Sequence, residues 1–277
     1  MTRRALAVLS FALPALLLAA SCSDKSDNPF EPGYTVFEVP SGYASIQTAA
    51  AQAEAGDRIV VTGRDDDYVG DVLLPAGVTL MRRENSLLMP VIRGGITAIG
   101  SSSSQTGVSD LRIEGFRVVN EAGSGILLQD CELAVVNCWI DSCAVAGVEI
   151  VGDGAVVVSR CDLQACGTGI LIRGVTEAAH YPDDDHPDGQ GPVVVNCNFL
   201  DNLAGSDYRN LVFQNLAAAD TVSVNLNYWG GDMDTYVMPL DDTIIDNKDD
   251  ANNPGYADTN GDGFQSLVTP WPRDWHD

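Results

Sequence analysis

A short pattern that occurs three times between Leu111 and Arg173 limits what this chain can fold into. A glycine followed by three mostly aliphatic residues recurs at Gly125, Gly147 and Gly169, about 22 residues apart. Strands this short, separated by Gly and Asn/Asp/Ser turns, are typical of a β-solenoid and not of leucine-rich or helical repeats. About 22 residues are enough for one coil of three strands, and stacked coils lie about 4.8 Å apart. The repeat therefore predicts an all-β chain that forms a parallel β-helix.

Stacked coils place equivalent residues in columns, and the apolar residues of this chain fall into such columns. Small, polar or charged residues separate them, so one face of each strand is expected to be buried. A single coil cannot bury its own apolar face, and both ends of the solenoid therefore need caps. The expected inward columns are Leu111/Leu133/Val156, Ile113/Val135/Val158, Phe116/Cys138/Cys161/Cys197 and Val118/Ile140/Leu163/Phe199.

Residues 1–21 have the composition of a signal peptide, with Arg3 and Arg4 before the apolar run 9–20. The small residues that end this segment stand directly before Cys22, an order that resembles the bacterial lipoprotein signal. The resemblance implies that Cys22 is lipidated and becomes the mature N-terminus. An ordinary secreted protein, in which Cys22 is incidental, is the alternative.

Residues 22–33 are polar and show no periodicity, so they are interpreted as a tether. No second long apolar run follows, and contact with the membrane is expected through the lipid anchor alone. The formal net charge of -24 at pH 7 disfavours binding to nucleic acid and to anionic lipid head groups. We therefore expect an exported monomer, anchored in the bacterial outer membrane or at the cell surface.

The segment that precedes the repeats resembles a known protein family. Residues 45–53 have the composition of a short helix, and Gly56-Asp57 ends it before the strand Arg58-Ile59-Val60-Val61. Together with Leu74-Pro75-Ala76-Gly77-Val78-Thr79-Leu80, this order resembles the entry of right-handed parallel β-helix proteins of the pectin lyase-like superfamily. In that superfamily the helix covers the N-terminal end of the solenoid, where an open coil would leave strand edges and core unprotected.

A second resemblance lies closer to the C-terminus. The order Asn225-Leu226-Asn227-Tyr228-Trp229-Gly230 is similar to the segment that ends the last coil of many bacterial β-helix proteins. The resemblance implies a right-handed β-helix over residues 34–240 and an irregular acidic cap over residues 241–277. It says little about activity, because the superfamily contains lyases, esterases, glycosidases, adhesins and inert modules.

One outward column offers side chains that suit a carbohydrate. The register places Arg117, Trp139, Asp162 and Asn198 in a single file that points away from the core. Hydrogen-bonding groups spaced by one coil suit an extended glycan, and the Trp139 ring could stack on a sugar face. Packing of Trp139 beneath a loop is the alternative interpretation.

The enzyme sites of the superfamily cannot be matched to this chain residue by residue. Its lyases bind Ca²⁺ through clustered acids and use a basic side chain as the base, while its pectin methylesterases use paired Asp with an Arg. A base must lie within hydrogen-bond reach of the proton that it removes. Arg160, Arg173 and Asp162 are of suitable types, and Glu149, on a second outward column, is interpreted as a surface partner of Arg173.

A structural calcium site is predicted near the C-terminus. Residues 258–264 match the first seven positions of a Ca²⁺ loop, although Thr269 at the twelfth position cannot supply the bidentate acid. The ion would stabilise the cap, and a plain Asp/Asn/Gly-rich turn is the alternative. The expected metal-binding residues are Asp258, Asn260, Asp262 and Phe264.

Two further groups have open interpretations. The polar interruption around His180 and His186 is either a metal site or a solvated acidic loop. The cysteines either form a ladder of buried thiols or pair as disulfides between adjacent coils. Two columns contain them, Cys138/Cys161/Cys197 and Cys143/Cys166.

The favoured hypothesis is a cell-envelope lipoprotein whose β-helix binds extracellular or envelope polysaccharide without catalysis. A polysaccharide lyase or hydrolase is the first alternative, and a structural or adhesive surface module is the second. An enzyme should show clustered acids with an Arg or Lys on adjacent coils, whereas a binding protein should show polar and aromatic side chains in file.

Overall fold

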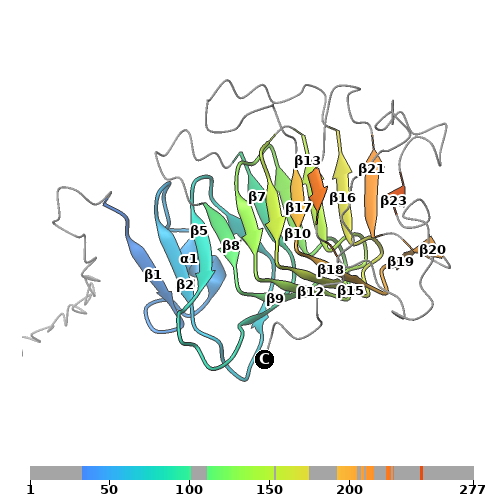
Figure 1. The fold of residues 1–277 in the computed structure, drawn as a ribbon. Coiled ribbons are helices and arrows are strands. Elements are labelled where there is room, and N and C mark those ends of the chain that lie inside the picture. Colours follow the sequence, from blue (N-terminus) through green and yellow to red (C-terminus); the bar gives the residue numbers. More distant parts are fainter. Residues whose placement is uncertain are drawn as a thin grey trace, which may run out of the picture.

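The chain folds into a solenoid of short parallel strands. The computed structural model describes residues 33–100, 111–152, 154–174, 192–204, 207–208, 210–214, 223–225, 227 and 244–245. Three sheets run along the solenoid, from β1 at one end toward β21 and β23 at the other (Figure 1). Among the described residues, every pairing between coils is parallel, and β19 (Leu203–Ala204) and β20 (Asp207–Tyr208) form an antiparallel hairpin. The predicted parallel β-helix is confirmed.

Each of six complete coils contributes one strand to each sheet. The eight-stranded sheet contains β1 (Val36–Val39), β2 (Arg58–Val61), β5 (Thr79–Arg82), β8 (Arg112–Glu114), β11 (Ala134–Val136), β14 (Val157–Ser159), β17 (Val193–Val195) and β22 (Ser223–Asn225). The six-stranded sheet contains β3 (Tyr68–Val69), β6 (Val91–Arg93), β9 (Arg117–Val119), β12 (Trp139–Asp141), β15 (Asp162–Gln164) and β18 (Asn198–Leu200). The seven-stranded sheet contains β4 (Val72–Leu74), β7 (Ile96–Ile99), β10 (Ile126–Gln129), β13 (Val148–Val151), β16 (Ile170–Arg173), β21 (Leu211–Gln214) and β23 (Ile244–Ile245).

The strand register confirms the predicted inward columns. Val135 pairs with Ile113 on one side and with Val158 on the other. The column Val118/Ile140/Leu163/Phe199 is formed in the same way across β9, β12, β15 and β18. The register also continues across residues 101–110, because β8 pairs with both β5 and β11. The repeat period therefore predicted the stacking of the described coils correctly.

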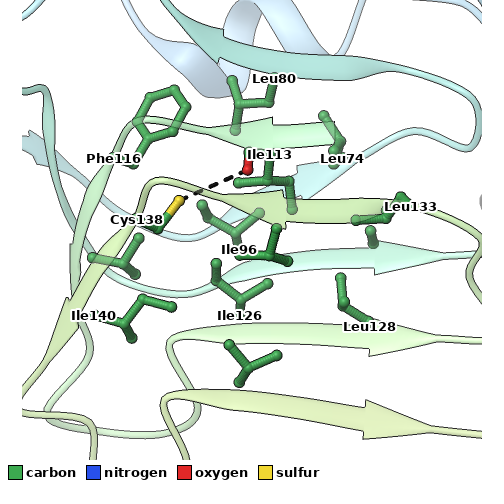
Figure 2. Packing of buried hydrophobic residues seen from close by; sticks show 14 of the residues in the cluster. Leu74, Leu80, Ile96, Ile113, Phe116, Ile126, Leu128, Leu133, Cys138 and Ile140 are labelled. Atoms are coloured by element: carbon green, nitrogen blue, oxygen red, sulfur yellow. Dashed lines mark hydrogen bonds between the residues drawn. The ribbon is translucent and has the colours of Figure 1, made fainter. Parts of the chain in front are cut away.

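The core is a continuous apolar interior enclosed by the three sheets. Figure 2 shows side chains from all three sheets together in this interior. They include Leu80 and Ile113 from the eight-stranded sheet, Ile140 from the six-stranded sheet and Ile126 from the seven-stranded sheet. Each of these four side chains is 0% exposed. Burial of one such side chain contributes roughly 1.5–3 kcal/mol, so the stacking of coils is the main source of stability.

The glycines of the repeat are explained by close packing between coils. A Cβ atom on Gly147 would lie 2.8 Å from the carbonyl oxygen of Gly169 and 2.9 Å from Leu163 Cδ2. A Cβ atom on Gly125 would likewise lie 2.9 Å from the carbonyl oxygen of Gly147. Because a side chain there would force coils apart, glycine recurs once per coil at the entry of the seven-stranded sheet.

A second column consists of residues with left-handed backbone at the turn into the six-stranded sheet. In successive coils this residue is Gly115, Asn137, Arg160 and Asn196, with φ of 81°, 53°, 52° and 55°. Glycine and asparagine adopt this conformation at low cost, whereas a long side chain does not. Arg160 is therefore the strained member of the column.

Helix α1 (Ile46–Ala50) packs against β1, β2 and β4 at the N-terminal end of the solenoid. Ser45 caps it, because its hydroxyl accepts a hydrogen bond from the backbone N–H of Thr48 at 3.1 Å. Ile46 and Ala49 are 0% exposed. The predicted capping helix is confirmed, although it is shorter than the segment 45–53.

Toward the C-terminal end of the solenoid, asparagine side chains supply hydrogen-bond partners for backbone groups. Asn202 accepts a hydrogen bond from the backbone N–H of Cys166 and donates one to the carbonyl of Leu163. Asn227 does the same for Cys197 and Val194. Both asparagines are 0% exposed, so these bonds satisfy backbone groups that water cannot reach. Asn227 belongs to the segment that resembles the end of the last coil, and this is its structural role.

Candidate ligand-binding face

The predicted outward column forms on the six-stranded sheet. Trp139 pairs in register with Arg117 on one side and with Asp162 on the other, and Asp162 pairs with Asn198. All four side chains are partly exposed. The structure therefore brings the predicted residues into one file on four consecutive coils. Their spacing is that of neighbouring strands, about 4.8 Å.

Asp141 fixes the position of Arg117. Its Oδ2 accepts hydrogen bonds from Arg117 Nε at 2.8 Å and from Arg117 Nη2 at 2.7 Å. The Asp141 side chain is 9% exposed and that of Arg117 is 39% exposed, so the ion pair has one buried and one accessible partner. A buried carboxylate requires such a partner, and removal of the arginine would leave an uncompensated charge.

The guanidinium of Arg117 lies over the Trp139 ring. Its Cζ is 4.5 Å from the ring centroid, the distance of a cation–π contact. In this arrangement a sugar has to approach the ring from its edge or from its other face, because Arg117 covers one face. The indole Nε1 is buried and has no hydrogen-bond partner among the described residues. The Trp139 ring and the Arg117 guanidinium thus form one stacked pair.

The polar file continues on the next two coils. Asn198 Nδ2 donates a hydrogen bond to Asp162 Oδ1 at 2.6 Å. Gln164 lies beside them on β15 and is partly exposed. Amide and carboxylate groups of this kind can both donate to and accept from hydroxyl groups. The face from Arg117 to Asn198 therefore combines polar groups with an aromatic edge.

On the seven-stranded sheet, one outward column is buried toward the C-terminal end. Glu149, Leu171 and Val212 form a register column there and are 5%, 9% and 3% exposed. Arg173 donates from Nε and Nη2 to Glu149 Oε1, and the hydroxyl of Ser124 donates to Glu149 Oε2. The predicted pair of Glu149 and Arg173 is present, but its carboxylate is buried and does not belong to the surface.

The outer face of the eight-stranded sheet is apolar in its C-terminal half. Outward positions there are occupied mostly by valines, namely Val136, Val157, Val193 and Val195, with Ser159 as a polar exception. Val157 is 37% exposed and Val136 only 7%. Valine side chains lack the hydrogen-bonding groups that fix a polar ligand. The six-stranded sheet, by contrast, carries an accessible polar or aromatic residue on each of four consecutive coils, from Arg117 to Asn198.

The basic side chains limit what chemistry the described residues can perform. Every basic residue in the described part of the chain is an arginine. Arginine keeps its proton in proteins, so these residues cannot remove one from a substrate. His180, His186 and Lys248, which are better suited to proton transfer, lie outside the described residues. The described arginines are therefore binding groups, and a base among the described residues would have to be a carboxylate such as Asp162.

The described cysteines are free and buried, in agreement with the thiol ladder and not with disulfides. Hydrogen bonding to Cys161 and burial raise the pKa of the Cys138 thiol well above its usual range. Burial is the first cause of the raised pKa of Cys161. Thiols of this kind stay protonated and are poor nucleophiles at neutral pH.

Several predicted residues lie outside the described part of the chain. These are Cys22, the loop around His180, the metal-binding residues Asp258, Asn260, Asp262 and Phe264, and the acidic cap over 241–277 apart from β23 (Ile244–Ile245). Among the described residues, no group of three or more His, Cys, Asp or Glu side chains could hold a metal ion. The calcium site and the lipidated cysteine therefore remain predictions.

Comparisons of the chain with protein-family models, with curated proteins and with solved structures found no match. Within the described residues, no helix combines the length and the apolar character needed to cross a membrane. The function therefore has to be argued from the geometry of the solenoid faces.

Sequence reasoning missed one residue of the candidate face. The spacing of the repeat does not reveal that Asp141 is the partner of Arg117.

Proposed function

We propose that this chain is an exported β-helix protein of the pectin lyase-like superfamily that binds polysaccharide along its six-stranded sheet without cleaving it. The observation that carries this proposal is the accessible file of Arg117, Trp139, Asp162 and Asn198 on consecutive coils. An extended polymer with repeating hydroxyl groups matches a surface whose hydrogen-bonding groups also repeat.

The character of the other faces at these coils supports the choice of this one. The outward column of the seven-stranded sheet is at most 9% exposed at Glu149, Leu171 and Val212, and the C-terminal half of the eight-stranded sheet presents mostly valines. Sugar recognition needs polar groups that a ligand can reach. The six-stranded sheet supplies them together with the edge of Trp139.

Incubation of the purified full-length protein with a panel of neutral and acidic polysaccharides tests this function. Retention of the protein by a polysaccharide, without reducing-end or unsaturated products, is the expected result. The experiment is run with and without Ca²⁺, so that a role of the predicted calcium site is also detected. Absence of retention on every polymer would contradict the proposal and favour a structural or adhesive surface module.

A polysaccharide lyase or hydrolase is the second candidate, and the accessible carboxylate of Asp162 favours it. Asp162 is partly exposed on the proposed binding face, next to Trp139, and its Oδ1 accepts a hydrogen bond from Asn198 Nδ2. A carboxylate that a ligand can reach is a group that could accept a proton from a substrate. Formation of products in the same incubation would support this candidate. The variant D162N would then have to abolish product formation, because it keeps the shape of the side chain but removes its basicity.

We also propose that Cys22 is lipidated and holds the protein at the outer membrane or cell surface. Residues 1–21 and the small residues before Cys22 support this. Metabolic labelling with a tagged fatty acid should mark the wild-type protein and leave Cys22→Ser unlabelled and released from membranes. Labelling of the Cys22→Ser variant would contradict the anchor.

A further inference from the structure

We infer that the six-stranded face takes a neutral polysaccharide, and that Asp141 is the positioning residue that disfavours an acidic one. This inference rests on the proposed function, because it names the class of ligand for the same face. It begins from the basic groups that this face presents. Recognition of a uronate carboxylate in proteins relies on an available arginine or lysine.

Both arginines that point outward from this sheet already hold a carboxylate. Arg117 donates from Nε and Nη2 to Asp141 Oδ2, and Arg93 donates from Nε to Asp67 Oδ2 at 2.8 Å. An acidic sugar would have to compete with these intramolecular partners. It would also meet the negative charge of Asp141 beside Arg117 and that of Asp67 beside Arg93.

The rest of the face strengthens this bias. Asp162 adds a further carboxylate on the coil next to Trp139, and the chain as a whole carries a formal net charge of -24. Such a field lowers the local concentration of polyanions. Hydroxyl groups of a neutral sugar face no such penalty.

The groups that remain available suit hydroxyls. Arg117 Nη1 has no hydrogen-bond partner among the described residues, and the Arg117 side chain is 39% exposed. Asn198 and Gln164 supply amides further along the same face. A hydroxyl group can accept from the guanidinium and donate to an amide oxygen, and neither bond requires a charge on the ligand.

The variant D141N tests the role of Asp141, since it keeps the shape of the side chain and removes the charge that holds Arg117. Wild-type protein should bind neutral glucans, mannans or galactans more tightly than polygalacturonate at equal ionic strength without Ca²⁺. In D141N this preference should fall about tenfold, the size of one charge-assisted hydrogen bond. Thermal unfolding of the variant is measured beside the binding, to show that it is folded.

E149Q is the matched control. Glu149 lies in the same coil, is similarly buried and holds an arginine of an adjacent coil, but it belongs to the seven-stranded sheet. E149Q should leave the preference unchanged although it removes the same charge. The double variant R117Q/D141N is a second test, because it removes the charge of Asp141 without releasing an arginine. It should retain the wild-type discrimination against polygalacturonate.

The outcomes separate the inference from the proposed function. Equal or tighter binding of polygalacturonate by the wild-type protein would overturn the neutral ligand while leaving polysaccharide binding intact. An unchanged preference in D141N, or the same loss in E149Q, would overturn the role of Asp141. Retention of the wild-type protein by no polysaccharide at all would remove the proposed function and the inference together.

Discussion

At the scale of single residues, one turn position holds a residue type that does not suit its backbone conformation. Arg160 adopts φ 52° at a position that neighbouring coils fill with Gly115, Asn137 and Asn196. Its side chain is exposed, so the turn gains no packing from it. The residue therefore costs backbone strain without a visible compensation.

The substitution Arg160→Asn should stabilise the protein by about 1 kcal/mol, because asparagine tolerates left-handed backbone better than arginine. The measurement is the free energy of unfolding in urea. The reverse experiment, Asn137→Ala, should destabilise the protein, since it creates the same strain one coil away. A loss of stability in Arg160→Asn would show that the arginine side chain makes an important contact.

The buried thiols predict how stability depends on pH. Burial and thiol contacts raise the pKa values of Cys138 and Cys161 in the folded chain, whereas an unfolded cysteine titrates at about 8.5. Between these values the unfolded state loses a proton that the folded state keeps. The contribution is therefore complete below about pH 8.5 and is lost as the pH rises above it.

Urea unfolding at pH 7, 8.5 and 10 should accordingly show a free energy that decreases toward pH 10. The double variant Cys138→Ala/Cys161→Ala should show a smaller decrease, although it is less stable at every pH because it leaves cavities. An identical pH dependence in both proteins would show that other groups are responsible.

At the scale of the strand and its turns, the glycine column explains why the repeat is visible in the sequence. Gly125 and Gly147 lie where a Cβ atom would come within 3.0 Å of the next coil. At both positions one of the close atoms is a backbone carbonyl oxygen, so moving a flexible side chain cannot relieve the whole contact. It therefore recurs in every coil that has this packing.

Gly147→Ala should destabilise the protein by about 1–3 kcal/mol through overpacking. Gly123→Ala is the matched control, because its Cβ would meet only the movable amide of Asn120, at 3.3 Å. Thermal unfolding distinguishes the two variants. Equal stability of Gly147→Ala and wild type would mean that the coils separate freely at this point.

These elements also show why some features were predictable from the sequence and others were not. The columns followed from a fixed period, because each coil repeats the same burial pattern, and Ile113, Val135 and Val158 lie as predicted. The partner of Arg117 did not follow, because Asp141 stands one coil away and two residues beyond the register position. The repeat period determines the strand register, whereas the partner of a long side chain depends on the rotamer that this side chain adopts.

At the scale of the whole molecule, the solenoid distributes its surfaces unequally. Its interior is apolar, and its outer faces differ. The C-terminal half of the eight-stranded sheet presents mostly valines, the seven-stranded sheet has a buried column, and the six-stranded sheet has a polar file. A fold built from stacked coils can dedicate one long face to a polymer while the others serve packing. The proposed function uses this asymmetry.

The most direct test of this account compares Trp139→Ala with Val151→Ala on the polysaccharide that retains the wild-type protein. Both residues belong to the same coil, but Val151 lies on the seven-stranded sheet. Trp139→Ala should raise the dissociation constant about tenfold or more, as for a truncated central aromatic contact, while Val151→Ala binds like the wild type. Equal binding of wild type and a folded Trp139→Ala variant would contradict the claim that the six-stranded sheet is the binding face.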